Sequence, residues 1–238
     1  MKSEKGKEQI IVEREGERDR RARVIAIDGP AGAGKSTVAR RVATRLGYLY
    51  VDTGGMYRAL TLKVLRAGVD PDDERALAGL AASTRITVES ASGRILLDGE
   101  DVTSAIRGPA VSAAVSRVAR SPAVREILTR RMRELAQPGG AVLEGRDIGT
   151  CVVPEADCKV FLTASLEERA RRRWKELRET GYPVSFEEVR DNLASRDEAD
   201  SRRGLAPLAV AEGAVVIDTT DLDVEQTVEA VLRLCQDE

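Results

Sequence analysis

Eight consecutive residues, Gly29 to Ser36, have the types and the spacing that bind nucleotide phosphates. They read Gly-Pro-Ala-Gly-Ala-Gly-Lys-Ser, so two glycines bracket four residues ahead of Lys35 and Ser36. In this pattern the backbone N–H groups surround the phosphates, the lysine reaches the outer phosphates and the serine hydroxyl binds Mg²⁺. An apolar run, Val24–Ile27, precedes the loop, and a helix-forming segment, 37–46, follows it. Because this order aims a helix N-terminus at an anion, the sequence predicts a nucleoside triphosphate site rather than a simple glycine-rich turn.

Two further clusters combine acids with arginine. Asp52-Thr53-Gly54-Gly55-Met56-Tyr57-Arg58 follows the apolar run 48–51, and Glu144-Gly145-Arg146-Asp147-Ile148-Gly149-Thr150 follows the run 141–143. Ligands of open α/β sheets bind beyond the carboxyl ends of the strands, so both clusters should face the phosphate loop. Arginine binds phosphate in a bidentate manner, and a carboxylate accepts from an amino or hydroxyl group. The clusters therefore predict a second nucleotide-like ligand.

Asp52 has two interpretations that the sequence leaves open. It ends the apolar run 48–51, where a carboxylate could support a Mg²⁺ ion bound to Ser36 without ligating it directly. It also precedes a segment that we expect to be helical, where it could act as the N-cap.

Composition limits the chemistry. The 238-residue chain contains no histidine, which excludes a Ser-His-Asp triad, a histidine-bound metal and imidazole acid–base catalysis. Phosphoryl transfer needs positioning and charge neutralisation more than a strong base, so it remains compatible. The net charge of −2 gives no general attraction to nucleic acid or to an anionic membrane. The three cysteines form no CxxC pair, so we expect neither a disulfide framework nor a zinc site, and we expect a cytoplasmic location.

Short apolar runs alternate with helix-length segments along most of the chain. This alternation predicts a parallel sheet of about five strands with helices on both faces, an α/β fold of the P-loop NTPase type. The expected strands are Val24–Ile27, Tyr48–Val51, Ala141–Leu143, Lys159–Leu162 and Ala214–Ile217. One stretch, 85–102, breaks the alternation and predicts a two-stranded hairpin inside an inserted subdomain. Residues 1–22 are mostly charged, with both signs mixed, and we expect a disordered extension.

Five blocks, in order, closely resemble the bacterial cytidylate kinases, nucleoside monophosphate kinases that act on CMP and dCMP. The resemblance covers about residues 23–236, and the blocks are GPAGAGKST, DTGGMYRA, EGRDIGT, FLTASLEERARRR and SRDEADSRRGLAPL. Gly55 stands where the family more often has alanine, and Glu144 where aspartate is common. The resemblance implies one domain over 23–236. Its core would be 23–67 and 139–236, with a nucleoside monophosphate-binding insert over 68–138 and a helical lid over 165–203.

The resemblance also implies roles for individual residues. The ATP phosphates would be held by Gly29, Pro30, Ala31, Gly32, Ala33, Gly34, Lys35, Ser36 and Thr37. CMP would be held by Thr53, Arg58, Ser116, Arg125, Arg146, Asp147, Arg196, Asp200 and Arg203. Catalysis would rest on Lys35, Arg146, Arg172 and Arg173, with the last two in the lid. Mg²⁺ would bind the hydroxyl of Ser36.

Spacing alone permits other interpretations. Arg196, Asp200 and Arg203 fall at i, i+4 and i+7 of one helix, where a surface ladder of ion pairs is common. Arg172 follows Glu168 by four residues, so the lid could be a self-paired, solvated helix. Asp147 could cap the segment that follows the third strand.

The activity implied is transfer of a phosphoryl group from ATP to CMP or dCMP, with Mg²⁺ as cofactor, by a monomer. We expect small-molecule substrates and no nucleic-acid or membrane partner. Two alternatives differ in class: a kinase for another small acceptor such as UMP, AMP or shikimate, and a non-catalytic nucleotide-binding switch.

Overall fold

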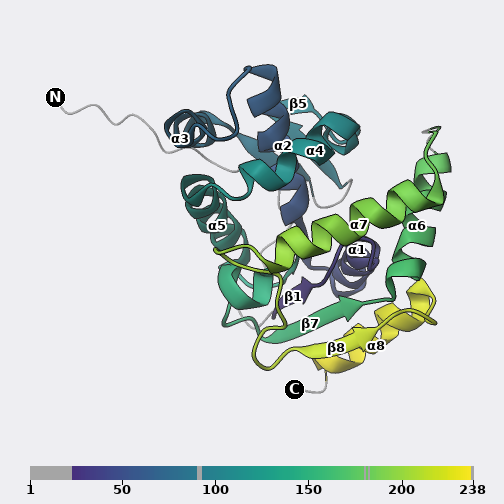
Figure 1. Cartoon of the computed structure of the whole chain (residues 1–238). Coiled ribbons are helices and arrows are strands. Elements are labelled where there is room, and N and C mark those ends of the chain that lie inside the picture. Colours follow the sequence, from purple (N-terminus) through teal and green to yellow (C-terminus); the bar gives the residue numbers. More distant parts are fainter. Residues whose placement is uncertain (1–22, 90–92, 180, 182, 237–238) are drawn as a thin grey trace. The chain divides into compact units, whose positions relative to one another are not determined.

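The computed structural model describes residues 23–89, 93–179, 181 and 183–236 (Figure 1). The expected charged extension, 1–22, and Ser92 of the expected hairpin turn lie outside these residues. The chain forms two compact units. One is Thr53–Leu135, and the other comprises the described residues up to Asp52 and from Ala136 onward. The expected boundaries of the insert and the lid stay predictions.

The second unit is built on a five-stranded parallel sheet in the order β2-β6-β1-β7-β8. The predicted α/β fold with a parallel sheet is confirmed. Ile27 of β1 and Asp52 of β2 both pair in register with Glu144 of β6, so acidic residues collect at the carboxyl ends of the strands. The strands are β1 (Val24–Asp28), β2 (Leu49–Asp52), β6 (Ala141–Glu144), β7 (Cys158–Thr163) and β8 (Val215–Asp218).

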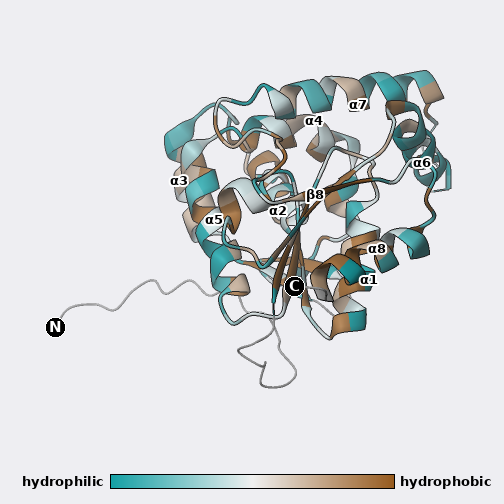
Figure 2. Cartoon of the chain, turned by 90° about the horizontal axis from the view of Figure 1, so that it is seen from below, coloured by the Kyte–Doolittle hydropathy of each residue, from teal (hydrophilic) through white to brown (hydrophobic). Residues whose placement is uncertain are grey.

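Apolar side chains hold α1 (Lys35–Leu46) and α8 (Val224–Gln236) against this sheet. Val38 and Val42 of α1 and Val228 and Val231 of α8 are buried in one cluster with strand residues such as Ile25. In Figure 2 the strands of the sheet are brown and the two helices lie side by side, with hydrophilic residues on their outer surface. Burial of apolar surface therefore fixes the helix that follows the phosphate loop.

The helices α6 (Leu166–Glu179) and α7 (Phe186–Ser201) pack against each other through a small apolar cluster. Trp174 meets Phe186 edge-on in this cluster, with ring centroids 6.3 Å apart. Ser185 and Glu188 form a capping box at the start of α7. Between β6 and β7 the chain forms a single π-helical turn, η2 (Ile148–Val152), which periodicity could not predict.

The unit Thr53–Leu135 places α2 (Thr53–Arg66) against a small antiparallel sheet and other helices. The predicted hairpin is confirmed as β3 (Ile86–Glu89) and β4 (Arg94–Leu97), and a third short strand, β5 (Glu100–Asp101), extends it. The remaining elements are α3 (Glu74–Ser83), η1 (Ala105–Arg107), α4 (Pro109–Val118) and α5 (Pro122–Ala136).

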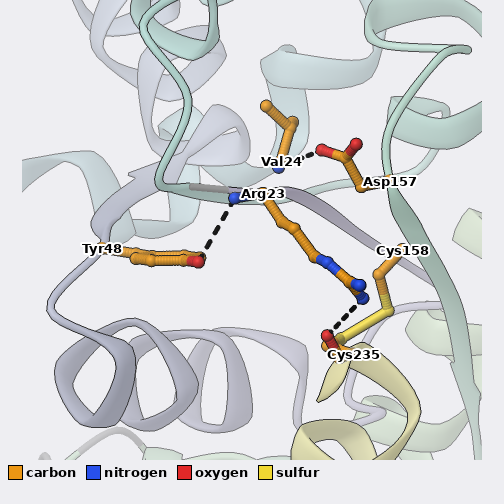
Figure 3. Close-up of a disulfide and its surroundings, with 6 residues drawn as sticks. All are labelled: Arg23, Val24, Tyr48, Asp157, Cys158 and Cys235. Atoms are coloured by element: carbon orange, nitrogen blue, oxygen red, sulfur yellow. Dashed lines mark hydrogen bonds between the residues drawn. A yellow bond between two sulfur atoms is a disulfide. The ribbon is translucent and has the colours of Figure 1, made fainter. Parts of the chain in front are cut away.

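A disulfide joins Cys158 at the start of β7 to Cys235 near the end of α8 (Figure 3). The expectation of no disulfide was wrong. The two cysteines are 77 residues apart in sequence, and only the packing of α8 on the sheet brings their Cα atoms to 5.6 Å. Arg23 donates from Nη1 to the carbonyl oxygen of Cys235 at 2.7 Å, which ties the start of β1 to the same corner.

Candidate active site

The phosphate loop follows β1 and leads directly into α1, as the sequence predicts. Gly29 must be glycine, because a Cβ there would lie 1.9 Å from the carbonyl oxygen of Leu162 in β7. Its φ of 144° is also one that L side chains rarely adopt. The loop therefore sits tightly on the sheet, and the first N–H groups of α1 are available to an anion at its end.

Lys35 is buried, with 5% of its surface exposed, and its Nζ donates to the carbonyl oxygen of Pro30 at 2.7 Å. Burial lowers the pKa of this ammonium to about 7, and the neighbouring Arg146 lowers it further than any other charge. Glu144 and Asp28 offset only part of this lowering, so an incoming anion would favour the charged form of Lys35. The loop thus holds its lysine folded back against its own backbone.

The hydroxyl of Ser36 donates to Oε1 of Glu144 at 2.5 Å, and the hydroxyl of Tyr50 reaches the same oxygen at 3.3 Å. Hydroxyl and carboxylate oxygens are the ligands that Mg²⁺ prefers, and Mg²⁺ commonly takes only one or two groups from the protein. This pair therefore fits the ion. Asp52 lies beside Glu144 in the register of β2 and β6, but the carboxylate in contact with Ser36 is that of Glu144.

Arg146 links the phosphate loop to α7. Its Nη1 donates to the carbonyl oxygen of Gly29 at 3.1 Å, and its Nε donates to Oδ2 of Asp200 at 2.9 Å. The side chains of both partners are largely buried, with 21% of Arg146 and 15% of Asp200 exposed. One guanidinium therefore joins the loop that should hold ATP to the helix that should hold the acceptor.

The predicted residues Arg196 and Asp200 lie on α7, whereas Arg203 lies two residues beyond its end, so the three do not form a surface ladder on one helix. The side chain of Arg203 is only 9% exposed, and its Nη2 lies 3.3 Å from Oδ1 of Asp200. Within the described part of the chain, the buried Nε and Nη2 atoms of Arg203 have no hydrogen-bond partner. Arg196 lies near enough to Lys35 to lower the pKa of that ammonium. Buried guanidinium N–H groups that make no hydrogen bond among the described residues, even beside the Asp200 carboxylate, are suited to binding a phosphate.

Asp147 directly follows Arg146 in the sequence, and its side chain is buried, with 6% of the residue exposed. It stands at the N-cap position of η2, yet its side chain makes no capping hydrogen bond, so that alternative is wrong. The turn is held instead by Asp28, whose carboxylate accepts from the backbone N–H groups of Ile148 at 2.9 Å and Gly149 at 2.8 Å. Burial raises the pKa of Asp28 to about 6, and the charge of Asp147 adds to the rise.

The two lid arginines differ in their surroundings. Arg172 donates to Thr219 from Nη1 at 3.0 Å and to Glu168 from Nε at 2.9 Å. Its Nη1 also lies 3.8 Å from the point that a Cβ of Gly34 would occupy, so this guanidinium adjoins the phosphate loop. Arg173 pairs with Glu176 at 2.7 Å on α6.

Four predicted acceptor residues belong to the unit Thr53–Leu135, and they are Thr53, Arg58, Ser116 and Arg125. Thr53 is buried at the first position of α2, and Ser116 is half-buried on α4. Arg58 donates to the Ser112 hydroxyl at 3.3 Å. Arg125 is 5% exposed and lies over the ring of Tyr57, 5.7 Å from its centroid. This unit therefore holds its own set of inward-placed cations.

Comparison with known proteins agrees with this geometry. The family model described as cytidylate kinase matches residues 25–237. The chain belongs to the cytidylate kinase family. It is 54% identical over 212 residues to a cytidylate kinase of Geobacillus kaustophilus, covering 88% of this chain and 95% of the relative. It is 52% identical over 214 residues to a cytidylate kinase of Desulfitobacterium hafniense, covering 90% of this chain and 92% of that relative.

Among solved structures, the fold is similar to an uncharacterised protein of Eubacterium ventriosum. The TM-score is 0.50 at 9% identity, over 91% of this chain and 99% of that one.

Two residues of this cytidylate kinase family member escaped the analysis of the sequence as site residues. Glu144 was placed in the cluster expected to face the phosphate loop and noted as a departure from the usual aspartate, but it was given no role of its own. Asp28, an acid that ends the apolar strand ahead of the loop, was likewise given no role. Neither residue belongs to a motif whose spacing predicts its contacts. The contact of Glu144 with Ser36 and that of Asp28 with Ile148 are therefore seen only in the folded structure.

Proposed function

We propose that this protein transfers the γ-phosphoryl group of ATP to CMP and dCMP, giving ADP with CDP or dCDP. The observation that carries the proposal is the double contact of Arg146 with Gly29 in the phosphate loop and with Asp200 on α7. This contact joins a triphosphate loop to a cluster of buried arginine and aspartate suited to a second phosphate. Membership of the cytidylate kinase family supports the same assignment.

Phosphoryl transfer here requires no general base, since the attacking oxygen of the acceptor phosphate is already anionic near neutral pH. The protein must instead align two anionic substrates and neutralise charge on the transferring group. Lys35 and Arg146 would meet that charge from the loop side, and Arg172 from α6. Arg203, whose buried N–H groups lack partners within the described residues, would bind the acceptor phosphate.

Mg²⁺ would be held by Ser36 and Glu144, with the remaining positions left to phosphate oxygens and water. The ion, when bound, supplies positive charge to the β- and γ-phosphates. Ser36 donates its hydrogen to Glu144, so the lone pairs of its oxygen stay free to bind the ion. Asp52, adjacent in the sheet, would support the site from outside the direct ligands.

The choice of base would rest on hydrogen-bond complementarity. The carboxylate of Asp147 can accept from the N4 amino group of cytosine, whereas uracil presents a carbonyl oxygen at that point. Two buried acceptors that face each other cost about 1–3 kcal/mol. In the unit Thr53–Leu135, the guanidinium of Arg125 is suited to donate to acceptor atoms such as N3 and O2 of cytosine. Thr53, Arg58, Ser116 and Arg196 would complete the contacts to sugar and phosphate.

The test is direct measurement of the phosphorylated acceptor formed from Mg-ATP with CMP, dCMP, UMP, AMP and shikimate as separate acceptors: a nucleoside diphosphate from each nucleotide and a phosphate ester from shikimate. Formation of CDP and dCDP with kcat/KM well above that for the other acceptors is expected. Preferred use of another acceptor, or ATP hydrolysis that no acceptor accelerates, would reject the proposal.

A further inference from the structure

Both backbone groups of Ala31, in the middle of the phosphate loop, are bound by one ion pair. Arg169 of α6 donates from Nη1 to the carbonyl oxygen of Ala31 at 3.0 Å. Asp197 of α7 accepts from the N–H of Ala31 through Oδ1 at 3.4 Å. The two side chains also bind each other, with Nη1 of Arg169 2.5 Å from Oδ2 of Asp197. A single peptide segment of the loop is thus held from two helices at once.

The contact is buried and closely packed. The side chains of Arg169 and Asp197 are 9% and 20% exposed, and Nε of Arg169 is anchored on the carbonyl oxygen of Ala164 at 2.9 Å. A Cβ on Gly32 would lie 3.0 Å from the Cβ of Arg169, so the loop backbone rests on α6 itself. The methyl group of Ala31 is buried in the same apolar cluster that joins α6 to α7.

A second link ties the loop to α7. Arg146 touches Gly29 and binds Asp200, which lies one helical turn after Asp197. The loop is therefore fixed to α7 at two separate points. One point, Asp197, directly follows the predicted acceptor residue Arg196, and the other, Asp200, is itself a predicted acceptor residue.

We propose that Arg169 and Asp197 are positioning residues, which hold the phosphate loop at Ala31 in a fixed position relative to α7. They act through the backbone of the loop and touch no reacting atom. A loop whose peptide groups are already fixed loses less conformational freedom when phosphates bind, so the pair favours ATP binding. The link to the acceptor residues rests on the function proposed above, whereas the link to the loop does not.

Helix packing alone does not explain where these side chains lie. The apolar cluster, with Trp174 against Phe186, already joins α6 to α7. The donors of Arg169 are directed instead to carbonyl oxygens outside the helix pair, one of them in the phosphate loop. A structural ion pair between two helices would have no need to bind the loop.

The experiment compares Asp197→Asn and Arg169→Lys with two matched controls. Asp197→Asn keeps the shape of the side chain but removes the charge, and lysine cannot reproduce the several contacts of the guanidinium. Glu198→Gln and Arg171→Lys make the same changes at neighbouring exposed ion pairs of α7 and α6. Calorimetric titration at 25 °C gives the Kd of Mg-ATP without acceptor and the Kd of CMP alone, after circular dichroism has verified folding.

The Kd of Mg-ATP is expected to rise at least fivefold in both test variants and less than twofold in both controls, while the Kd of CMP stays within twofold of wild type. Folded test variants with an unchanged Kd for Mg-ATP, or with an equal loss of CMP affinity, would overturn the proposal. If one test variant does not fold, the other decides. A wild-type protein that binds Mg-ATP but ignores CMP would reject the proposed function, and the Mg-ATP values would still decide this inference.

Discussion

The burial of Lys35 lowers the pKa of its side chain, and this should affect how the protein binds a nucleotide. Its pKa is lowered to about 7 in the empty loop, mainly by burial, so at pH 8 most of the ammonium has lost its proton. Phosphate charges close by favour the protonated form. We therefore expect Mg-ATP binding at pH 8 to take up close to one proton. Calorimetry in buffers of different ionisation enthalpy measures this uptake.

The Lys35→Arg variant is the control for that measurement. Its guanidinium stays charged at every pH used, so binding should take up no proton at this site. Equal proton uptake by wild type and variant would contradict this account of Lys35.

Arg203 is the residue that we propose to bind the acceptor phosphate, and its burial should cost stability when no phosphate is bound. Its Nε and Nη2 atoms are buried without hydrogen-bond partners among the described residues, which is unfavourable until a phosphate arrives. We expect Arg203→Met to leave Tm unchanged or higher and to lower kcat/KM for CMP at least 100-fold. Thermal melts and steady-state kinetics measure the two effects.

Arg202 gives a control for this variant, because it directly precedes Arg203, is exposed and pairs with Glu198. Arg202→Met should leave kcat/KM for CMP near that of wild type. A lower Tm for Arg203→Met with unchanged kinetics would assign Arg203 a purely structural role.

At the scale of elements, Asp28 holds η2 and so fixes the turn that carries Arg146 and Asp147. Its pKa in the folded protein, about 6, lies above the ordinary value of 3.8. The folded state therefore takes up a proton between these values while the unfolded state does not, and stability from this group increases as the pH falls. The neighbouring charges are those of Asp147 and Lys35, of which Asp147 raises the pKa and Lys35 lowers it.

The Asp28→Asn variant tests this linkage. An amide cannot take up the proton. When the pH is lowered from 7.5 to 5, the free energy of unfolding of wild type should therefore rise by about 1 kcal/mol relative to that of the variant. Urea unfolding at the two pH values measures the difference. A constant difference, or one that shrinks at pH 5, would contradict the assigned direction.

The elements also show which features the sequence could predict. The five strands followed from short apolar runs and the hairpin from a break in their alternation with helices, although β8 proves to be largely exposed. The phosphate loop followed from fixed spacing. The π-helical turn η2 could not be predicted, since a backbone contact with Asp28, 120 residues away, holds it. Contacts such as that of Ser36 with Glu144 depend on strand order in the same way.

On the scale of the whole molecule, the disulfide between Cys158 and Cys235 closes a long loop of the chain. Constraining such a loop in the unfolded state is commonly worth about 2–4 kcal/mol. We expect Cys235→Ser to lower the free energy of unfolding by that amount in oxidising buffer. With a reductant present, wild type and variant should unfold alike, and an equal stability of the two under oxidation would contradict this role.

The same disulfide bears on location. Disulfides are uncommon in a reducing cytoplasm, so the cytoplasmic location predicted from the cysteine count loses that support. Among the described residues, no helix is both long enough and apolar enough to cross a bilayer. The monomeric state stays a prediction.

The central claim is that Asp147 selects a cytosine nucleotide for phosphorylation at this loop. Its most direct test is the ratio of kcat/KM for CMP to that for UMP, in wild type and in Asp147→Asn. An asparagine amide can donate to the uracil carbonyl, so the mismatch of about 1–3 kcal/mol should disappear. We predict a ratio of about 100 in wild type that falls at least tenfold in the variant. An equal ratio in both proteins would contradict the account.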